Sequence, residues 1–380
     1  MECEYFERGE CRSCTAMGVP IPRQRAAKQA RAEAAVVVAR DAAGVRWLEP
    51  FGGPEADYRN KAKMVVGGTL DAPTLGILDA ARHGVDLRAC GIMTPGLRAA
   101  MPALAAFVTT AGLTPYDVPS RRGELKHLLV TESPDGELMV RFVLRSTEPL
   151  PRLRKHLGGL LAQLPIRVAT ANLLPTHVAL LEGEEEHVLT AEDALPMRLG
   201  GLTLRLPPRS FFQTNTAVAA ALYRQAAEWA DRVLVPGAQP HDVVDLYCGV
   251  GGFALALAGP GRRVLGIETS AEAIAAARTT AADAGMRDTA FLPGDATEWL
   301  ATAGEPPDLV VVNPPRRGLG ERLTAALEAS GAPTVVYSSC NPDTLARDLA
   351  AMPSYRAVEA RCFDMFPQTD HLEVMVLLQR

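Results

Sequence analysis

The sequence predicts an α/β protein whose C-terminal part is a doubly wound parallel sheet, preceded by a β-rich α+β domain and a short cysteine-containing segment. Within residues 206–380, short apolar runs alternate with helical segments, as in a parallel sheet covered by helices. Within residues 51–205, strand-like runs follow one another with few helices between them. Residues 1–50 hold three cysteines and a basic helical stretch. We therefore expect three domains with these boundaries.

The composition is that of a globular protein. The chain has 380 residues, of which 48% are hydrophobic and 22% are charged. It contains no run of 18 apolar residues, so we expect no membrane span and no membrane partner. Residues 1–5 are acidic and lack the apolar core of a signal peptide, which favours a cytoplasmic location. Cysteines in that reducing compartment rarely form disulfides, so metal binding or catalysis is their more informative explanation.

Positive charge is unevenly distributed along the chain. The net charge of −5 argues against a nucleic-acid partner, but Arg23, Arg25, Lys28 and Arg31 gather in one helix predicted from about Pro22 to Arg40. A basic helix of this kind suits a phosphate backbone. A solvated surface helix would have the same composition, so both explanations stay open.

The β-rich domain contains a clear hairpin signal. Residues 125–131 and 138–144 are strand-like and flank the turn residues Pro134-Asp135-Gly136. Residues 167–173 and 177–181 read as further strands. These runs predict an antiparallel sheet with a few helices.

The C-terminal domain begins with a helix at residues 217–230, and another helix is predicted at 271–284. Two last strands, 355–362 and 371–379, are joined by a connection too short for a helix. The apolar runs that predict the other strands are residues 241–247, 263–267, 289–292, 308–312 and 334–337.

A glycine-rich turn follows the first of these strands. Residues 242–253 read as a strand, a turn around Gly249 and the start of a helix, so that the backbone can approach a ligand closely. The spacing lacks the third glycine of the dinucleotide fingerprint. Glu268 ends the next strand, where a carboxylate can accept from two ribose hydroxyls, and Asp295 closes the third, at the position of an adenine contact. This ordered set resembles an S-adenosylmethionine site; an α/β domain that binds another nucleotide, or none, is the alternative.

Cys340 stands at the end of the strand predicted at 334–337. Asn341 is typical of a helix N-cap and Pro342 of a first helical residue. The positive end of that helix is expected to favour the thiolate, which is the nucleophilic form of cysteine. The alternative is a small buried packing residue, as most free cysteines are.

The chain resembles the RNA 5-methyluridine methyltransferases over nearly its whole length. Segments 58–63 and 122–126 of the β-rich domain match the family as well as the C-terminal part does. The resemblance identifies that C-terminal part as a class I, Rossmann-like S-adenosylmethionine-dependent methyltransferase domain, whose last strand is expected to be antiparallel. Besides the glycine-rich turn, the segments that carry the resemblance there are 210–215, 313–318, 339–342 and 369–373.

Within this family, the similarity is closest to the 23S ribosomal RNA enzymes that act on the uridine-747 hairpin. Those enzymes begin directly at a cysteine cluster, without the N-terminal β-barrel of the uridine-1939 enzymes, and this chain begins in the same way. The resemblance therefore implies a 23S ribosomal RNA hairpin uridine as the substrate. We expect the protein to act as a monomer.

The chemistry implied by the resemblance uses a thiol and a carboxylate. Cys340 would add to carbon 6 of uracil, which makes carbon 5 nucleophilic enough to accept a methyl group. Glu373 would then remove the carbon-5 proton so that the cysteine is expelled. Its neighbours Leu372 and Val374 are apolar, so desolvation should raise the pKa of Glu373.

Matched residue by residue, four positions correspond to cofactor contacts of the family: Gln213, Tyr247, Glu268 and Asn313. Gly249 and Asp295 complete the expected S-adenosylmethionine site. Many relatives carry aspartate where Asn313 stands, which puts in doubt any role that needs a charge there.

The N-terminal cysteines form a possible metal-ligand set. Cys3, Cys11 and Cys14 are followed at a distance by Cys90, and four thiolates suit an iron–sulfur cluster or a structural zinc. Zinc sites more usually pair two close doublets, whereas Cys90 has no nearby partner. The family resemblance implies a [4Fe-4S] cluster with a structural or RNA-positioning role. The remaining cysteines, Cys248 and Cys362, are expected to be packing residues.

Three other functions compete with this hypothesis. Asn313-Pro314-Pro315 suggests an amino methyltransferase, but Arg316 stands where an aromatic residue would stack on the base, and Cys340 would have no role. A non-catalytic ribosome-assembly factor on the same scaffold would not need Cys340, Glu373 or the glycine-rich turn. A 5-methyluridine methyltransferase acting on another ribosomal or transfer RNA uridine would use the same chemistry; the cysteine cluster argues against transfer RNA.

Overall fold

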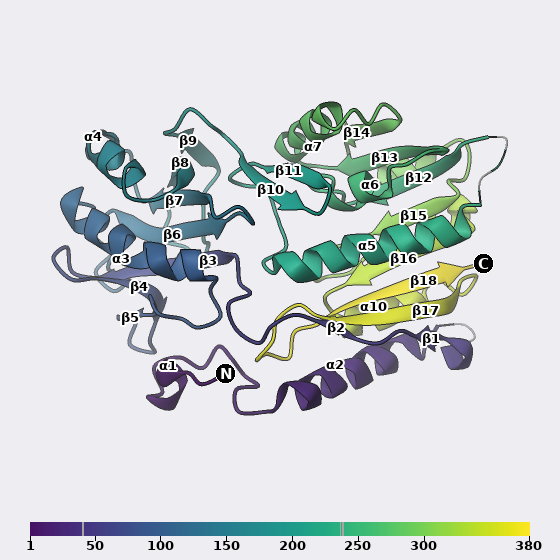
Figure 1. The fold of residues 1–380 in the computed structure, drawn as a ribbon, viewed down its shortest axis with the longest axis horizontal. Coiled ribbons are helices and arrows are strands. Elements are labelled where there is room, and N and C mark those ends of the chain that lie inside the picture. Colours follow the sequence, from purple (N-terminus) through teal and green to yellow (C-terminus); the bar gives the residue numbers. More distant parts are fainter. Residues whose placement is uncertain (40–41, 236, 238) are drawn as a thin grey trace. The chain divides into compact units, whose positions relative to one another are not determined.

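The computed structural model describes residues 1–39, 42–235, 237 and 239–380, so that Arg40, the expected end of the first helix, lies outside the described residues. The chain forms two compact units, whose elements are labelled in Figure 1. Unit 1 comprises Met1–Cys14, Glu55–Arg198 and Pro207–Arg209; unit 2 comprises Thr15–Pro54, Leu199–Leu206 and Ser210–Arg380.

Unit 2 is built on a mixed sheet in the order β1-β17-β18-β16-β15-β12-β13-β14, and β2 pairs with β17. Strands β12 to β16 are parallel, while β18 lies antiparallel between β16 and β17. This confirms the expected strands and the antiparallel last strand. The bounds are β1 Arg46–Trp47, β2 Phe51–Gly52, β12 His241–Leu246, β13 Arg262–Glu268, β14 Thr289–Pro293, β15 Leu309–Val312, β16 Thr334–Ser339, β17 Arg356–Asp364 and β18 Glu373–Gln379.

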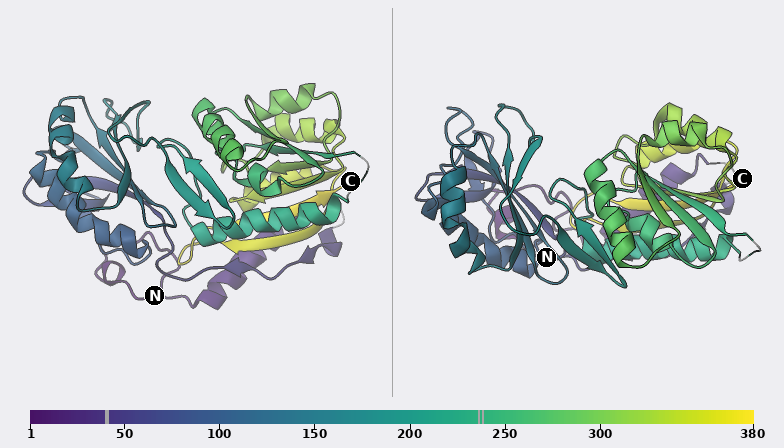
Figure 2. Two further views of the ribbon diagram at one scale, coloured as in Figure 1. Left: turned by 45° about the horizontal axis from the view of Figure 1, so that its top comes forward. Right: turned by 90° about the horizontal axis from the view of Figure 1, so that it is seen from above.

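Helices cover both faces of this sheet, as Figure 2 shows from two directions. On one face, alanine and leucine side chains of α2, α8, α9 and α10 pack in one buried cluster with the central strands. The predicted helices are confirmed: α5 and α7 cover residues 217–230 and all but the last residue of 271–284. The bounds are α2 Ile21–Val36, η1 Ala42–Gly44, α5 Thr216–Val233, α6 Gly252–Leu257, α7 Ala271–Asp283, α8 Ala296–Thr302, α9 Gly320–Ser330 and α10 Pro342–Ala350.

Unit 1 contains a second sheet in the order β5-β4-β3-β6-β7-β8-β9. The predicted hairpin is confirmed by the antiparallel pairing of β6 with β7, but β7 and β8 are parallel because α4 crosses between them. The strand expected at 177–181 is wrong, since those residues are irregular. The bounds are α1 Glu4–Glu7, β3 Lys61–Gly68, β4 Pro73–Leu78, β5 Gly84–Asp86, α3 Pro95–Thr110, β6 Leu125–Glu132, β7 Leu138–Leu144, α4 Leu150–Leu161, β8 Ile166–Leu173 and β9 Glu185–Val188.

Two further strands, β10 (Leu195–Leu199) and β11 (Leu202–Leu206), form a small sheet of their own. Helices α3 and α4 cover one face of the unit 1 sheet through a leucine-rich core. No helix within the described ranges combines the length and the apolar character needed to cross a membrane.

Candidate active site

Cys340 and Glu373 lie at neighbouring ends of two paired strands. Cys340 directly follows β16 and Glu373 begins β18, and the antiparallel register pairs Ser339 with Val374. The next pair of positions in that register is therefore the thiol and the carboxylate. The hydroxyl of Ser338 on β16 donates to Glu373 Oε1 at 2.7 Å. Two residues 33 positions apart in sequence are thus brought to the same edge of the sheet.

The carboxyl group of Glu373 is almost completely buried, with 2% of the residue exposed. Burial raises its pKa to about 7, and the hydrogen bond from Ser338 opposes part of that rise. The direction agrees with the expectation from its apolar neighbours. A carboxylate with this pKa is a stronger base than an ordinary surface glutamate.

The pKa of Cys340 moves in the opposite sense to our expectation. Burial first, and the negative charge of Glu373 second, raise the pKa of Cys340 to about 11. Asn341 does cap α10 as predicted, its Oδ1 accepting from Asp343 N at 3.1 Å. The helix end therefore does not make the thiolate the resting form at neutral pH, and that part of the sequence interpretation is wrong.

Arg316 is the positive group near this thiol. Its charge lowers the pKa of Cys340, against the larger effects of burial and Glu373. Its Nη2 lies 3.3 Å from His371 Nδ1, and its carbonyl oxygen accepts from Asn341 Nδ2 at 3.0 Å. Sequence reasoning used Arg316 only to exclude base stacking. Its position after β15, the parallel neighbour of β16, was the signal that could have placed it here.

The glycine-rich turn follows β12 in a left-handed backbone conformation. Tyr247 has φ of 65°, Gly249 of 53° and Gly251 of 87°. A side chain at Gly251 would meet the ring of Phe291 at 2.9 Å, so this glycine is required by packing. A Cβ at Gly249 would meet nothing within 4 Å. The backbone at Gly249 consequently borders open space, as a ligand-binding turn requires.

Glu268 ends β13 beside this turn. Its Oε2 accepts from Gly249 N at 3.3 Å and its Oε1 from Ser270 N at 3.0 Å, so that the carboxylate is held in place by backbone groups.

Asp295, after β14, accepts from Thr297 N at 2.8 Å and Glu298 N at 3.0 Å. Asp295 is therefore the N-cap of α8, a structural role that the sequence interpretation missed although Asp followed by Glu three residues later is a capping signal.

Asp245 is a buried acid on β12, the strand that leads into the glycine-rich turn, and the sequence predicted no role for it. Its Oδ2 accepts from Ala254 N at 2.9 Å, whereas its buried Oδ1 has no hydrogen-bond partner within the described part of the chain. Burial raises the pKa of Asp245 to about 8, and the charge of Glu268 adds to the rise. Most buried polar atoms of folded proteins have a hydrogen-bond partner, so the unpaired Oδ1 of Asp245 beside the glycine-rich turn is unusual.

The other two predicted cofactor residues, Gln213 and Asn313, also belong to unit 2. Gln213 is buried just before α5. Asn215, which caps α5, donates through Nδ2 to the carbonyl oxygen of Met365 at 3.2 Å. Asn313 directly follows β15 and is partly exposed. All the predicted cofactor residues except Gln213 thus lie at or just after the C-terminal ends of β12, β13, β14 and β15, and Gln213 lies just before α5.

The N-terminal cysteines belong to unit 1. Cys3, Cys11, Cys14 and Cys90 line one small pocket, together with Met1, Tyr5, Phe6, Leu87 and Ile92. Burial raises the pKa of Cys14 to about 11, and the other three thiols add to that rise. Among the residues that the structure describes, no three or more His, Cys, Asp or Glu side chains meet closely enough to hold a metal ion. The described residues therefore place four thiols around one pocket but do not form a metal site.

Comparison with known proteins gives three findings. The family model described as tRNA (Uracil-5-)-methyltransferase matches residues 188–302 and 307–380. The chain is 45% identical to the 23S rRNA (uracil(747)-C(5))-methyltransferase RlmC of Yersinia pseudotuberculosis, over 100% of this chain and 99% of that protein. It is also 45% identical to the enzyme of the same name from Cronobacter sakazakii, over the full length of both.

Among solved structures, the chain is similar to the Pyrococcus abyssi tRNA (uracil-54, C5)-methyltransferase, which was solved in complex with S-adenosyl-L-homocysteine. The TM-score is 0.76 and the sequence identity is 26%, with 96% of this chain and 85% of that chain covered. The fold is thus that of an S-adenosylmethionine-dependent uracil-5 methyltransferase.

Proposed function

Because the chain belongs to the RNA uracil-5-methyltransferase family, we propose that it methylates carbon 5 of one uridine in 23S ribosomal RNA, in the hairpin that contains uridine 747. Its full-length similarity to bacterial enzymes named for that nucleotide supports this substrate. The observation that carries the reaction is the half-buried thiol of Cys340 beside the buried carboxyl of Glu373, at the ends of β16 and β18.

Cys340 is the nucleophile in this proposal. Its sulfur adds to carbon 6 of uracil, and the electrons of the C5–C6 double bond move toward carbon 5 and the adjacent carbonyl. S-adenosylmethionine, when bound, supplies the methyl group that carbon 5 accepts. Since the pKa of Cys340 is about 11, only a small fraction of the thiol is ionised at neutral pH; the reacting form is this thiolate, whose proton has passed to the solvent before attack. The guanidinium of Arg316 stabilises the thiolate form.

Glu373 is the base that completes the reaction. It takes the proton from carbon 5, the C5–C6 double bond re-forms, and the bond between sulfur and carbon 6 breaks. Cys340 leaves as a thiolate and Glu373 becomes a neutral acid. A pKa of about 7 suits this step, because the carboxylate is substantially ionised at neutral pH yet basic enough to accept the proton.

The groups around the glycine-rich turn fit the cofactor. The open space beside Gly249, the carboxylate of Glu268 and the unpaired Oδ1 of Asp245 together suit a ligand with ribose hydroxyls and an ammonium group. Glu268 Oε1 accepts from Ser270 N and from the hydroxyl of Thr269, whereas Oε2 accepts from Gly249 N alone and retains a lone pair for a ligand. The residues that we assign to cofactor binding are Gln213, Tyr247, Gly249, Glu268, Asp295 and Asn313.

Cys3, Cys11, Cys14 and Cys90 are proposed to hold a [4Fe-4S] cluster. The donor set fits this group, because the lining of the pocket contributes four thiols and no carboxylate or imidazole. A cluster is larger than a single ion, so its ligands need not meet at one point. Protein purified without oxygen should contain iron and acid-labile sulfide in equal amounts. If the protein contains zinc and no sulfide, the four cysteines form a structural zinc site instead of a cluster. If it contains neither iron nor zinc, the proposal is contradicted.

A second substrate is supported by one comparison. The solved relative that is 26% identical is named for uracil 54 of transfer RNA, so the same fold serves that substrate elsewhere. Transfer RNA is therefore the alternative to 23S ribosomal RNA, with unchanged roles for Cys340 and Glu373. In either case the enzyme would act in the cytoplasm.

The deciding experiment compares the two RNAs directly. The purified protein is incubated with S-adenosylmethionine and either a 23S RNA fragment containing the uridine-747 hairpin or a transfer RNA transcript, and 5-methyluridine is mapped by mass spectrometry. We expect methylation of the 23S fragment only, lost when the target uridine is changed to cytidine. Methylation of transfer RNA alone would favour the second substrate. No methylation of either RNA would favour a non-catalytic assembly factor.

A further inference from the structure

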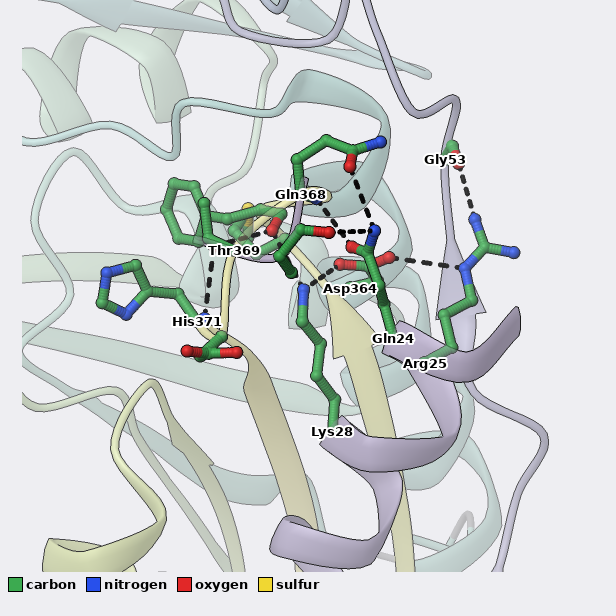
Figure 3. Close-up of polar contacts among 12 residues, drawn as sticks. Gln24, Arg25, Lys28, Gly53, Asp364, Gln368, Thr369 and His371 are labelled. Atoms are coloured by element: carbon green, nitrogen blue, oxygen red, sulfur yellow. Dashed lines mark hydrogen bonds and ion pairs between the residues drawn. The ribbon is translucent and has the colours of Figure 1, made fainter. Parts of the chain in front are cut away.

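Helix α2 buries two polar side chains one turn apart. Gln24 and Lys28 are each 3% exposed, and their spacing of four residues places them on the same face of the helix. In Figure 3 both project from α2 toward the segment that joins β17 to β18. Basic residues of α2 were expected to face a phosphate backbone or solvent. Lys28 does neither.

Lys28 binds the beginning of that connection. Its ammonium lies 2.6 Å from Asp364 Oδ1, with 4% of the lysine side chain and 2% of the aspartate side chain exposed. It also donates to the carbonyl oxygen of Phe366 at 2.9 Å. A buried ion pair adds little net stability once both charges have lost their hydration, but it fixes the geometry of its partners. The second bond, to a backbone carbonyl, fixes the chain itself.

Gln24 binds the middle of the connection through two hydrogen bonds. Its Nε2 donates to Gln368 Oε1 at 3.0 Å, and its Oε1 accepts from the backbone N–H of Gln368 at 2.8 Å. Gln368 has φ of 68°, a left-handed conformation that is unfavourable for a residue other than glycine. The backbone N–H of Ala16, ahead of α2, adds a bond to the carbonyl oxygen of Gln368 at 2.9 Å. These contacts hold a backbone conformation that the chain would not favour alone.

The end of the connection leads directly to the reacting groups. Arg31, also on α2, donates to the carbonyl oxygen of Asp370 at 2.7 Å. His371, which lies against Arg316, follows, and Glu373 comes two residues later as the first residue of β18. Helix α2 therefore holds the start, the middle and the end of the segment that delivers the base.

We propose that Lys28 and Gln24 are positioning residues, which fix the 364–370 connection and through it hold Glu373 at the carbon-5 proton. This inference rests on the proposed function, because it presumes that Glu373 is the base. It concerns one step only: removal of the carbon-5 proton, re-formation of the C5–C6 double bond and expulsion of Cys340. Methyl transfer precedes that step, so loosening the connection should trap the methylated covalent complex of protein and RNA.

The test is the full-length Lys28→Met variant, assayed for turnover and for an adduct with the 23S hairpin RNA that survives denaturing electrophoresis. We expect kcat to fall roughly tenfold or more, since small displacements of a reacting group have effects of this size. The adduct should accumulate, and KM for S-adenosylmethionine should stay unchanged. Gln24→Ala should behave similarly. An adduct level equal to that of the wild type in both variants would overturn the inference.

Two controls separate positioning from general damage. Glu33→Gln removes one charge from the exposed surface of the same helix, preserves the shape of the side chain, and should leave kcat and adduct unchanged. The double variant Lys28→Met with Asp364→Asn removes both buried charges and leaves only the guanidinium of Arg25, the second partner of Asp364, which is 31% exposed. Thermal stability should therefore recover while the adduct still accumulates. Recovery of both would mean that Lys28 is only a counter-ion, and would overturn its positioning role.

Failure of the proposed function gives a different pattern from failure of this inference. If the wild type forms 5-methyluridine and Glu373→Gln accumulates the adduct, the base is established whatever Lys28→Met does. If Glu373→Gln accumulates no adduct, the proposed mechanism itself fails.

Discussion

Cys340 and the four N-terminal cysteines show one type of side chain in two different surroundings. In both places burial is the main reason for a raised pKa, and Cys340 and Cys14 each reach about 11. The second cause differs. For Cys340 it is the carboxylate of Glu373, and for Cys14 it is the other thiols, Cys90 first.

This difference teaches that pKa alone does not assign the role of a cysteine. In the proposed mechanism, a single thiol beside a carboxyl and a guanidinium attacks a substrate and is then expelled, because the carboxyl acts as the base that completes the cycle. Several thiols that line one pocket lack such a base. Their thiolate forms would repel one another, and a bound positive centre would relieve that repulsion. The neighbours of each thiol, rather than its pKa, are therefore the basis on which we propose catalysis for Cys340 and metal binding for the four N-terminal cysteines.

The largest expected effect is the loss of methyl transfer when Cys340, the single thiol beside Glu373, is replaced. Cys340→Ala should reduce methyl transfer by at least about a thousandfold, since removing a nucleophile removes the covalent route. Binding of S-adenosylhomocysteine, measured by calorimetry, should be retained. Cys362→Ala, which changes a buried cysteine of the same unit that has no assigned role, is the matched control and should keep its turnover. Equal activity in the two variants would remove the distinction between these cysteines.

Glu373 should lower stability at the pH at which it supports catalysis. Its folded-state pKa of about 7 exceeds the usual value of 4.5, so the folded protein binds the proton more tightly and stability falls as pH rises from about 4.5 to 7. Glu373→Gln removes this penalty. The variant should be more stable than the wild type by about 3 kcal/mol at pH 8 and by almost nothing at pH 4.5, as measured by denaturant unfolding. A pH-independent difference would contradict the raised pKa.

A substitution in the pocket lined by Cys3, Cys11, Cys14 and Cys90 should change the metal content of the protein. Cys14→Ser should lower the iron content of protein purified without oxygen by roughly an order of magnitude, because one ligand of the cluster is lost. The Cys362→Ala protein again serves as the control and should keep its iron. If Cys14→Ser retains iron while Cys362→Ala loses it, the four N-terminal cysteines are not the ligands.

The smallest expected effect is the pH dependence of adduct decay. Only the ionised form of Glu373 removes the carbon-5 proton, so decay of the methylated adduct should be roughly tenfold slower at pH 6 than at pH 8, with a midpoint near pH 7. Rapid-quench measurements on wild-type protein would show this. A midpoint below pH 5 would indicate that Glu373 is solvated during the step.

Much of unit 2 could be predicted because buried parallel strands are continuous apolar runs. The strands around 263–267 and 334–337 were found in this way. Strands β1 and β2 were not, since two residues each leave no periodicity to detect. The run at 177–181 misled for the opposite reason: Val178 and Leu180 are apolar but about half exposed.

The site was predictable where a residue ends a strand and less so where its role depends on a distant partner. Cys340 and Glu373 were located by the strands beside them. Lys28 reads as a surface charge in the sequence, because its partner Asp364 lies 336 residues away. The direction of the pKa shift of Cys340 could not be predicted, because the local sequence shows the helix end but neither the burial of the thiol nor the nearby carboxyl of Glu373.

The most direct test of the central claim uses an RNA hairpin that carries 5-fluorouridine at the target position. Fluorine cannot be removed from carbon 5 as a proton, so the reaction stops at the covalent complex after methyl transfer. Digestion and mass spectrometry should find methylated fluorouridine attached to the peptide that contains Cys340, in protein incubated with S-adenosylmethionine. Attachment to any other cysteine, or methyl transfer without an adduct, would contradict the account.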